Sequence, residues 1–357
     1  MTDESVAPYM TSPAPGEGDI LVRVENLVKY FPVRTAGFFR RTVGNVQAVD
    51  GVSLAIPRGK TLGLVGETGS GKSTLARCVA GLLPATSGKV IFDGHDITNL
   101  SRSRMQPFRR EIQMIFQDPY GSLNPRRRVG AIIGDPFAIH KIVTGHERKR
   151  KVQELMERVG LNPEHYNRFP AEFSGGQRQR IGVARALALR PKLIICDEPV
   201  SALDVSIQAQ VLNLLADLQR DFGLTYLFIA HDLEVVRHVS DSVTVMYLGR
   251  VAEVGPKALV YDTPRHPYTA ALLSAAPAAD PDAAASRQRI ILAGDIPSPI
   301  DPPSGCRFHP RCPKAQDLCS QQEPPLEVKA GDAATHMTAC HFPVEAGENL
   351  AAAAARR

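Results

Sequence analysis

One short segment constrains this chain more than any other, because it joins an apolar strand to a helix through a glycine-rich loop. The run TLGLVG over residues 61–66 has the length and the bounding glycine of a buried strand, and a helix is predicted from near Lys72. Glycines let backbone N–H groups turn toward phosphate oxygens, and the helix N-terminus adds partial positive charge. The loop matches G-x-x-x-x-G-K-[ST] with Gly66, Glu67, Thr68, Gly69, Ser70, Gly71, Lys72 and Ser73. It predicts a nucleotide site, with Lys72 on the β- and γ-phosphates and Ser73 on Mg²⁺.

A pair of acids supplies the partner that such a loop needs. Residues 193–198 read LIICDE, an apolar strand that ends in Asp197 and Glu198. We expect this strand to lie near the strand of the phosphate loop in one sheet. Asp197 is then predicted to hold Mg²⁺, directly or through water, and Glu198 to polarise the attacking water as a general base.

Strands and helical segments alternate along the chain. Further strands are predicted at 21–28, 48–56, 225–232 and 242–249, with a loop at 35–45 and helical spacing of apolar residues from about 120 to 185. This alternation favours an α/β fold with a mostly parallel sheet covered on both faces. With 43% hydrophobic and 22% charged residues, the 357-residue chain is neither wholly disordered nor a small disulfide scaffold.

Charge and hydropathy limit the classes of function. A net charge of +5 on 357 residues does not demand nucleic acid as a partner. No apolar run approaches the about 18 residues that a membrane-spanning helix needs. The start, MTDESVAPYM, lacks the basic-then-apolar order of a secretory signal. We therefore expect a cytosolic protein whose work at a membrane would need a partner.

Changes in composition divide the chain into regions. Residues 1–19 are rich in Pro, Ser, Thr and Gly and are predicted to be disordered. A nucleotide-binding domain is predicted over 20–255, with a helical subdomain at about 119–185. A proline-rich, cysteine-bearing extension follows over 256–345, and residues 346–357 are predicted to form a flexible tail.

A further motif carries a family resemblance. The segment Phe173, Ser174, Gly175, Gly176 and Gln177 resembles the signature motif of ABC-type ATPases, whose first residue is usually Leu. A serine hydroxyl, glycine N–H groups and a helix predicted from near Gln177 all favour an anion. The resemblance implies a P-loop NTPase fold of the ABC cassette type, in which two domains sandwich ATP head to tail. The motif would then grip phosphate in the opposing site.

The other motifs of this family follow in order. Gln117 resembles the Q-loop glutamine that senses the γ-phosphate and Mg²⁺, and His231 resembles the switch histidine that contacts the γ-phosphate. Phe31 aligns with the aromatic residue that stacks on adenine, with Tyr30 as the alternative. The segment that resembles the D-loop, which contacts the opposing subunit, is Ser201, Ala202, Leu203 and Asp204. The resemblance extends the ATP contacts to Thr74 and makes the Mg²⁺ ligands Ser73, Gln117 and Asp197.

Longer stretches resemble one branch, the ATPase subunits of dipeptide and oligopeptide importers, and most of all the F-type member of their paired subunits. These stretches are VKYFPVRTAGFFRRTVGNVQAVDGVSL, FQDPYGSLNPRRRVG, CDEPVSALDVSIQAQVLNLL and TPRHPYTAALLSA. The resemblance implies ATP-driven uptake of di- or oligopeptides, with nickel or another small solute as the alternative cargo. It implies as partners a paralogous ABC ATPase, two transmembrane permease subunits and an extracytoplasmic peptide-binding protein, at the cytoplasmic face of the inner membrane, and no nucleic acid.

Two other classes of ABC protein are alternatives. Soluble members that act on DNA or ribosomes carry two cassettes or a long coiled-coil insertion, whereas only about 100 residues separate Gly66 from Ser174 here. Exporters commonly fuse a membrane-spanning region to the cassette, and none is predicted in this chain. Both alternatives are therefore disfavoured.

Four of the six cysteines cluster near the C-terminus with the spacing C-x5-C-x6-C-x20-C, namely Cys306, Cys312, Cys319 and Cys340. A disulfide framework is disfavoured in a cytosolic protein. Zinc stays open, although zinc modules use closer cysteine pairs, and so does an iron–sulfur cluster. Some peptide-importer ATPases bind a [4Fe–4S] cluster in this extension, so the resemblance favours the cluster over Zn²⁺ or no metal.

The metal, if bound, is expected to be a structural staple rather than a redox control. His309, His336 and His341 are substitute ligands of lower rank. Cys78 and Cys196 are predicted to be small buried residues of the core.

Overall fold

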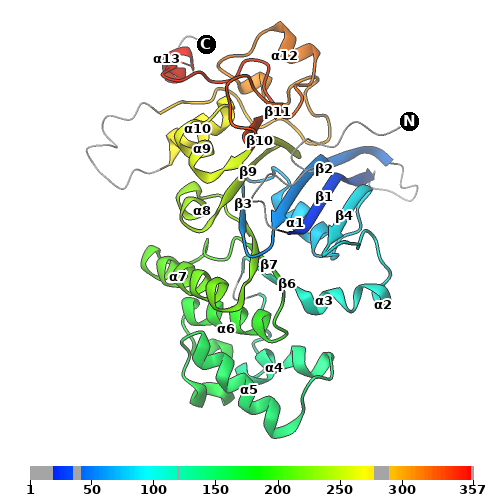
Figure 1. Ribbon diagram of the computed structural model, residues 1–357, viewed down its shortest axis with the longest axis vertical. Coiled ribbons are helices and arrows are strands. Elements are labelled where there is room, and N and C mark those ends of the chain that lie inside the picture. The colour runs from blue at the N-terminus through cyan, green and yellow to red at the C-terminus, as the bar shows by residue number, and fades with distance from the viewer. Residues whose placement is uncertain (1–18, 35–41, 119–120, 277–288, 355–357) are drawn as a thin grey trace. The chain divides into compact units, whose positions relative to one another are not determined.

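The chain folds into two compact units, one made of residues 1–57, 62–99 and 231–357 and the other of residues 58–61 and 100–230. The computed structural model describes residues 19–34, 42–118, 121–276 and 289–354 (Figure 1). The predicted disordered N-terminus lies outside these ranges, apart from residue 19. No helix in the described parts combines the length and the apolarity needed to cross a membrane.

The first unit contains an antiparallel sheet with the strand order β2-β1-β4-β5. Its strands are β1 (Ile20–Arg34), β2 (Thr42–Pro57), β4 (Ser87–Phe92) and β5 (His95–Asp96). The strands predicted at 21–28 and 48–56 are confirmed, but both are longer. The predicted loop at 35–45 is wrong for its last residues, because β2 begins at Thr42. This part of β2 is mostly exposed and pairs with β1, so no alternation of apolar residues marks it in the sequence.

Other strands of the first unit belong to a second sheet, in which they follow one another in the order β11-β12-β10-β9-β3. They are β3 (Thr61–Val65), β9 (Ser242–Tyr247), β10 (Arg250–Pro256), β11 (Glu327–Val328) and β12 (Met337–Thr338). Strands β3 and β9 are parallel, whereas β10 and the two short strands pair in antiparallel fashion. A tight turn at Leu248 and Gly249, both with positive φ, joins β9 to β10.

One helix of the first unit follows the phosphate loop, and most of the others lie in the C-terminal extension. The helices are α1 (Lys72–Val79), α8 (Leu233–Val239), α9 (Lys257–Asp262), α10 (Pro267–Ala275), α12 (Asp317–Gln321), α13 (Leu350–Ala354) and the 3₁₀ turn η4 (His309–Arg311). Helix α1 begins where the sequence predicts it. Helix α13 lies in the stretch that was predicted to be a flexible tail.

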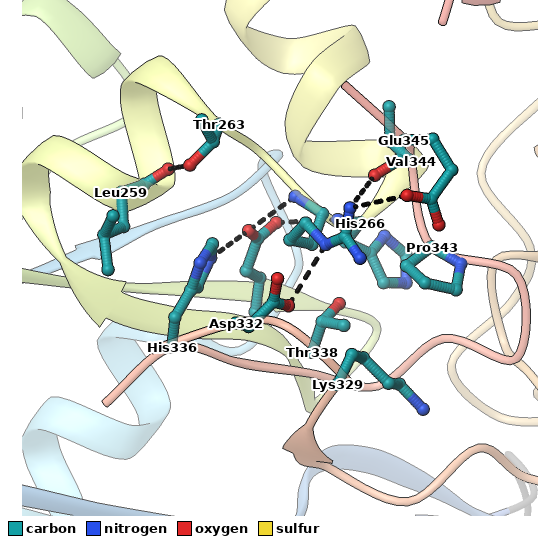
Figure 2. Close-up of polar contacts among 12 residues, drawn as sticks. Leu259, Thr263, His266, Lys329, Asp332, His336, Thr338, Pro343, Val344 and Glu345 are labelled. Carbon is teal, nitrogen blue, oxygen red and sulfur yellow. Dashed lines mark hydrogen bonds and ion pairs between the residues drawn. The ribbon is translucent and has the colours of Figure 1, made fainter. Parts of the chain in front are cut away.

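A wholly buried carboxylate joins the extension to β10. Glu253 is 0% exposed and accepts hydrogen bonds from the backbone N–H groups of Arg265 at 2.8 Å and His266 at 2.9 Å. The Nε2 atom of His336 lies 2.7 Å from Glu253 Oε1, and Arg265 Nε lies 3.1 Å from Asp332 Oδ2. Figure 2 shows His336 and Asp332 on one side of this network and His266 on the other. Residues far apart in the extension are thus tied to a single strand.

The second unit has a parallel sheet core, β8-β7-β6. Its strands are β6 (Ile112–Ile115), β7 (Leu193–Asp197) and β8 (Thr225–Ile229). Its helical elements are α2 (Arg102–Met105), α3 (Phe108–Glu111), α4 (Val129–Ile139), α5 (Gly145–Arg158), η2 (Pro163–Asn167), η3 (Pro170–Glu172), α6 (Gly175–Leu187) and α7 (Val205–Phe222). Helices α4, α5 and α6 gather beside one another (Figure 1). Strands β7 and β8 are buried along their whole length, as their continuous apolar runs predict.

Candidate nucleotide site

The phosphate loop joins β3 to α1 and depends on two glycines. Gly66 has a φ of +149° and Gly71 a φ of +102°. Residues other than glycine rarely adopt such backbone angles. A Cβ atom on Gly66 would lie 2.2 Å from the carbonyl oxygen of Met246, and one on Gly71 would lie 2.0 Å from that of Ala48. The tight curl of the loop therefore excludes any side chain at either position.

Lys72 points back into this loop rather than into solvent. The residue is 5% exposed, and its Nζ atom donates hydrogen bonds to the carbonyl oxygens of Gly66 at 2.7 Å and Glu67 at 2.9 Å. A third contact joins Nζ to Ser70 Oγ at 3.3 Å. The ammonium group thus lies inside the loop at the start of α1, where backbone N–H groups favour an anion.

The predicted acids follow β7, and one of them contacts the predicted Q-loop glutamine. Asp197 ends the strand and is 2% exposed. Glu198 has a left-handed backbone with a φ of +48°, and its N–H group donates to the carbonyl of Ile229 at 2.9 Å. Gln117, just after β6, donates a hydrogen bond from Nε2 to Glu198 Oε2 at 2.8 Å. The structure therefore brings Gln117 and Glu198 together.

The segment that resembles a D-loop continues from Glu198. The Ser201 hydroxyl donates to the carbonyl of Glu198 at 3.2 Å, and the Leu203 N–H group donates to the carbonyl of Val200 at 3.1 Å. Ala202 is exposed. Asp204 is exposed as well and occupies the N-cap position of α7. The turn that presents these residues is thus built on the backbone of the predicted general base.

The signature segment forms the start of α6, which begins at Gly175, two residues before the predicted position. Ser174 Oγ accepts the N–H of Gln177 at 3.3 Å, and Gln177 Oε1 accepts the N–H of Ser174 at 3.0 Å. This reciprocal pair is a capping box. A Cβ atom on Gly176 would lie 2.4 Å from Ile207 Cγ2, so this glycine allows α6 to approach α7. Ser174 and Gln177 themselves are exposed.

The two aromatic candidates for adenine differ in their environments. The Tyr30 hydroxyl donates to Asp50 Oδ1 at 2.5 Å, and burial together with this carboxylate raises the Tyr30 pKa. Phe31 is 36% exposed, and Lys29 Nζ lies 4.8 Å from its ring centroid. His231 is exposed, two residues after β8.

These residues divide between the two units. The phosphate loop with Ser73 and Thr74, the aromatic pair and His231 belong to the first unit. Gln117, Asp197, Glu198, the signature segment and the D-loop segment belong to the second.

The four C-terminal cysteines line one small cavity, together with His309 and His341. Burial raises the pKa of Cys312 and of Cys340 to about 12, and it also raises that of Cys306. Across residues 19–34, 42–118, 121–276 and 289–354, no group of three or more His, Cys, Asp or Glu side chains is placed to hold a metal ion.

The predicted cluster or zinc site is therefore not supported. His336, a substitute ligand by prediction, instead contacts Glu253. Cys78 and Cys196 are 5% and 0% exposed, which confirms them as core residues.

Two residues that contact the phosphate loop were missed by sequence reasoning. Arg311 forms an ion pair with the Glu67 carboxylate, and the Tyr268 hydroxyl accepts the Glu67 N–H. Both lie in segments that the sequence analysis noted for other reasons. Arg311 lies between two of the clustered cysteines, and Tyr268 lies in TPRHPYTAALLSA, a stretch that carries the family resemblance.

Comparison with known proteins agrees with this geometry. The family model described as ABC transporter matches residues 49–201, and that described as oligopeptide/dipeptide transporter, C-terminal region, matches residues 252–319. The oligopeptide transport ATP-binding protein AppF of Bacillus subtilis (strain 168) is 53% identical over 325 residues, which cover 91% of this chain and 98% of that protein. The dipeptide transport ATP-binding protein DppF of Escherichia coli (strain K12) is 47% identical over 329 residues, 92% of this chain and 96% of that protein.

Solved structures resemble about two thirds of the chain. The cbiO1 structure from Clostridium perfringens, part of the ABC transporter complex cbiONQ, has a TM-score of 0.59 at 28% identity and covers 69% of this chain and 92% of that chain. A dimeric post-hydrolysis structure of the ATP-binding cassette MJ0796 with ADP and Pi has a TM-score of 0.59 at 28% identity, covering 66% and 99%. This chain has the ABC ATPase fold and belongs to the family of ATP-binding proteins of oligopeptide and dipeptide ABC transporters.

Proposed function

We propose that this chain hydrolyses ATP at a head-to-tail dimer interface to drive uptake of di- or oligopeptides through partner permeases. The observation that carries the proposal is the hydrogen bond from Gln117 to Glu198. It joins two residues that were predicted independently for the hydrolytic step. The names of relatives that match over nine-tenths of the chain, which are oligopeptide and dipeptide transport ATP-binding proteins, support peptides as the cargo.

Each residue of the site has a proposed role. Lys72 and the loop N–H groups hold the β- and γ-phosphates, and His231 contacts the γ-phosphate. The oxygen donors Ser73, Gln117 and Asp197 are of the kind that Mg²⁺ prefers, and the ion would neutralise phosphate charge when bound. Glu198 polarises the attacking water, and the Gln117 amide orients its carboxylate. Phe31 is favoured for adenine, because the Tyr30 hydroxyl is bonded to Asp50.

The second half of the active site would come from another subunit. The exposed cap of α6, formed by Ser174 and Gln177 with the two glycines between them, is suited to grip phosphate in trans. The D-loop segment at 201–204 would contact the opposing subunit. The dimeric state of the MJ0796 cassette supports this arrangement. We propose a paralogous ATPase as the partner, on permeases at the cytoplasmic face of the inner membrane, with an extracytoplasmic peptide-binding protein.

We place the nucleotide-binding domain at 20–255, its helical subdomain at about 119–185 and the extension at 256–345. The match of a peptide-transporter C-terminal model to residues 252–319 supports the last of these.

The test is purification of the tagged chain from its native membranes. We expect two polytopic membrane proteins and a second ATPase to co-purify, and proteoliposomes of this complex to take up labelled dipeptide only with ATP and the binding protein. The Lys72→Met variant is the control and should abolish uptake. Uptake of nickel without uptake of peptide would instead support the alternative cargo, and co-purifying nucleic acid without permeases would contradict the proposal.

A further inference from the structure

The phosphate loop contains an acidic residue, Glu67, at its second position. The loop exists to attract anions through its N–H groups and Lys72. A carboxylate in the same loop repels the negative charge of a triphosphate unless a positively charged group neutralises the carboxylate. The surroundings of Glu67 therefore bear directly on how tightly the loop holds nucleotide.

Compensation comes from Arg311, which lies 244 positions away in the sequence. Its Nη1 and Nη2 atoms donate to the two carboxylate oxygens of Glu67, at 2.7 and 3.1 Å. The side chain of Arg311 is 9% exposed and that of Glu67 24%. A two-pronged ion pair with this little exposure fixes both the charge and the direction of the carboxylate.

The backbone of Glu67 is held as well. Its N–H group donates to the hydroxyl of Tyr268, a wholly buried residue of α10, at 2.8 Å. Its carbonyl oxygen accepts the 2.9 Å hydrogen bond from Lys72 Nζ. The C-terminal extension thus holds this loop residue through both its side chain and its backbone N–H group.

An aromatic cluster keeps the extension in place around the loop. The ring of Phe308 lies 5.2 Å from that of Tyr247 in β9 and 5.3 Å from that of Tyr268, and the two tyrosine rings are 4.8 Å apart. The 3₁₀ turn η4 begins directly after Phe308 and ends at Arg311. The N–H group of Arg311 donates to the carbonyl of Phe308 at 3.0 Å. The guanidinium group is therefore presented from a rigid base rather than from a loose tail.

We propose that Arg311 is a positioning residue for the phosphate loop, which neutralises Glu67 and turns its carboxylate away from bound nucleotide. The C-terminal extension thereby sets the affinity of the cassette for ATP. The inference rests on the proposed binding of ATP at this loop. Because its origin is electrostatic, the contribution of Arg311 grows with the number of phosphate charges on the ligand.

The experiment measures dissociation constants of ATP, ADP and AMP by calorimetry for the full-length chain and its variants. Arg311→Met should weaken ATP binding about tenfold, ADP binding less and AMP binding least. Adding Glu67→Gln to it should restore the affinity for ATP, because the uncompensated charge is gone. Glu67→Gln alone should bind ATP at least as tightly as the unmodified chain. Lys314→Met is the matched control, since it removes another ion pair of the extension, with Glu348, and should leave affinity unchanged.

Three results would overturn the proposal. They are unchanged ATP affinity in Arg311→Met, an equal loss for all three nucleotides, and a loss that Glu67→Gln does not reverse. If Arg311→Met does not fold, weaker ATP binding by Glu67→Gln alone contradicts the proposal. A chain that binds no ATP at all would overturn the proposed function as well, so the two failures are distinguishable.

Discussion

Gln117 donates a hydrogen bond to the carboxylate of Glu198 at 2.8 Å, across 81 positions of sequence. The contact joins the end of β6 to the end of β7, which are parallel neighbours. Glu198 holds a left-handed backbone at this point, with its N–H group bonded to Ile229. The direction of the carboxylate is thus set both by its backbone and by one amide side chain.

Gln117→Leu keeps the size of the side chain and removes the donor. We expect the kcat of ATP hydrolysis to fall about tenfold or more, because the variant loses both the donor that orients the base and a proposed Mg²⁺ ligand. Gln113→Leu is the matched control, since Gln113 lies in β6, four residues before Gln117, and its amide donates to the Arg109 carbonyl instead of to Glu198. Equal kcat values for the two variants would contradict the role of Gln117.

The start of α10 should make stability depend on pH. Burial lowers the pKa of His266 to about 4, although the negative charge of Glu253 acts to raise it. The His266 Nδ1 atom accepts a hydrogen bond from the N–H group of Tyr268 at 3.0 Å. Between the ordinary pKa of about 6.5 and this lowered value, the unfolded chain binds a proton that the folded chain does not. The free energy of unfolding therefore falls as the pH drops, by about 2 kcal/mol between pH 7 and pH 5.

His266→Asn tests this cause, because asparagine can also cap a helix but does not titrate. Denaturant unfolding at pH 7 and pH 5 should show that the variant loses about 2 kcal/mol less stability on acidification than the unmodified chain does. An unchanged pH dependence in His266→Asn would assign the effect to other groups.

The buried carboxylate of Glu253 should matter for the attachment of the extension. Glu253→Gln turns one acceptor into a donor beside the N–H groups of Arg265 and His266, and we expect a loss of roughly 1–3 kcal/mol in the free energy of unfolding. Thermal unfolding measures it. The comparison variant is Glu327→Gln, which removes an exposed ion pair with Lys329 and should change stability by less than about 0.5 kcal/mol. A Glu253→Gln variant as stable as Glu327→Gln would refute this account.

Two glycines of α6 should respond in opposite directions to alanine. Gly176→Ala places a Cβ atom 2.4 Å from Ile207 Cγ2, and the stiff, branched isoleucine leaves little room, so we expect a loss of roughly 1–3 kcal/mol. Gly182 has open space around its Cβ position, and Gly182→Ala should stabilise the helix by about 0.4–1 kcal/mol. Equal effects of the two substitutions on the unfolding midpoint would show that α6 and α7 do not pack as described.

Local patterns predicted the parts of the site that are built locally. The strand at 61–66 and the helix from Lys72 follow from an apolar run and glycine spacing, and both are confirmed. The pairing of Glu67 with Arg311 could not be predicted, because no local sequence pattern links two charged residues that lie 244 positions apart. The cysteine spacing correctly indicated one shared location, since all four line one cavity. The placement of the side chains, which spacing does not reveal, leaves the metal unsupported: in the described parts of the chain no group of three or more such ligands is placed to hold an ion.

The most direct test of the account is the rate of phosphate release by Glu198→Gln in the assembled complex. The variant keeps the size of the side chain and the partner of the Gln117 amide but removes the base. We predict that hydrolysis falls at least about a hundredfold, while ATP still binds and holds the ATPase dimer closed. Turnover close to that of the unmodified complex would contradict the assignment of Glu198 as the general base.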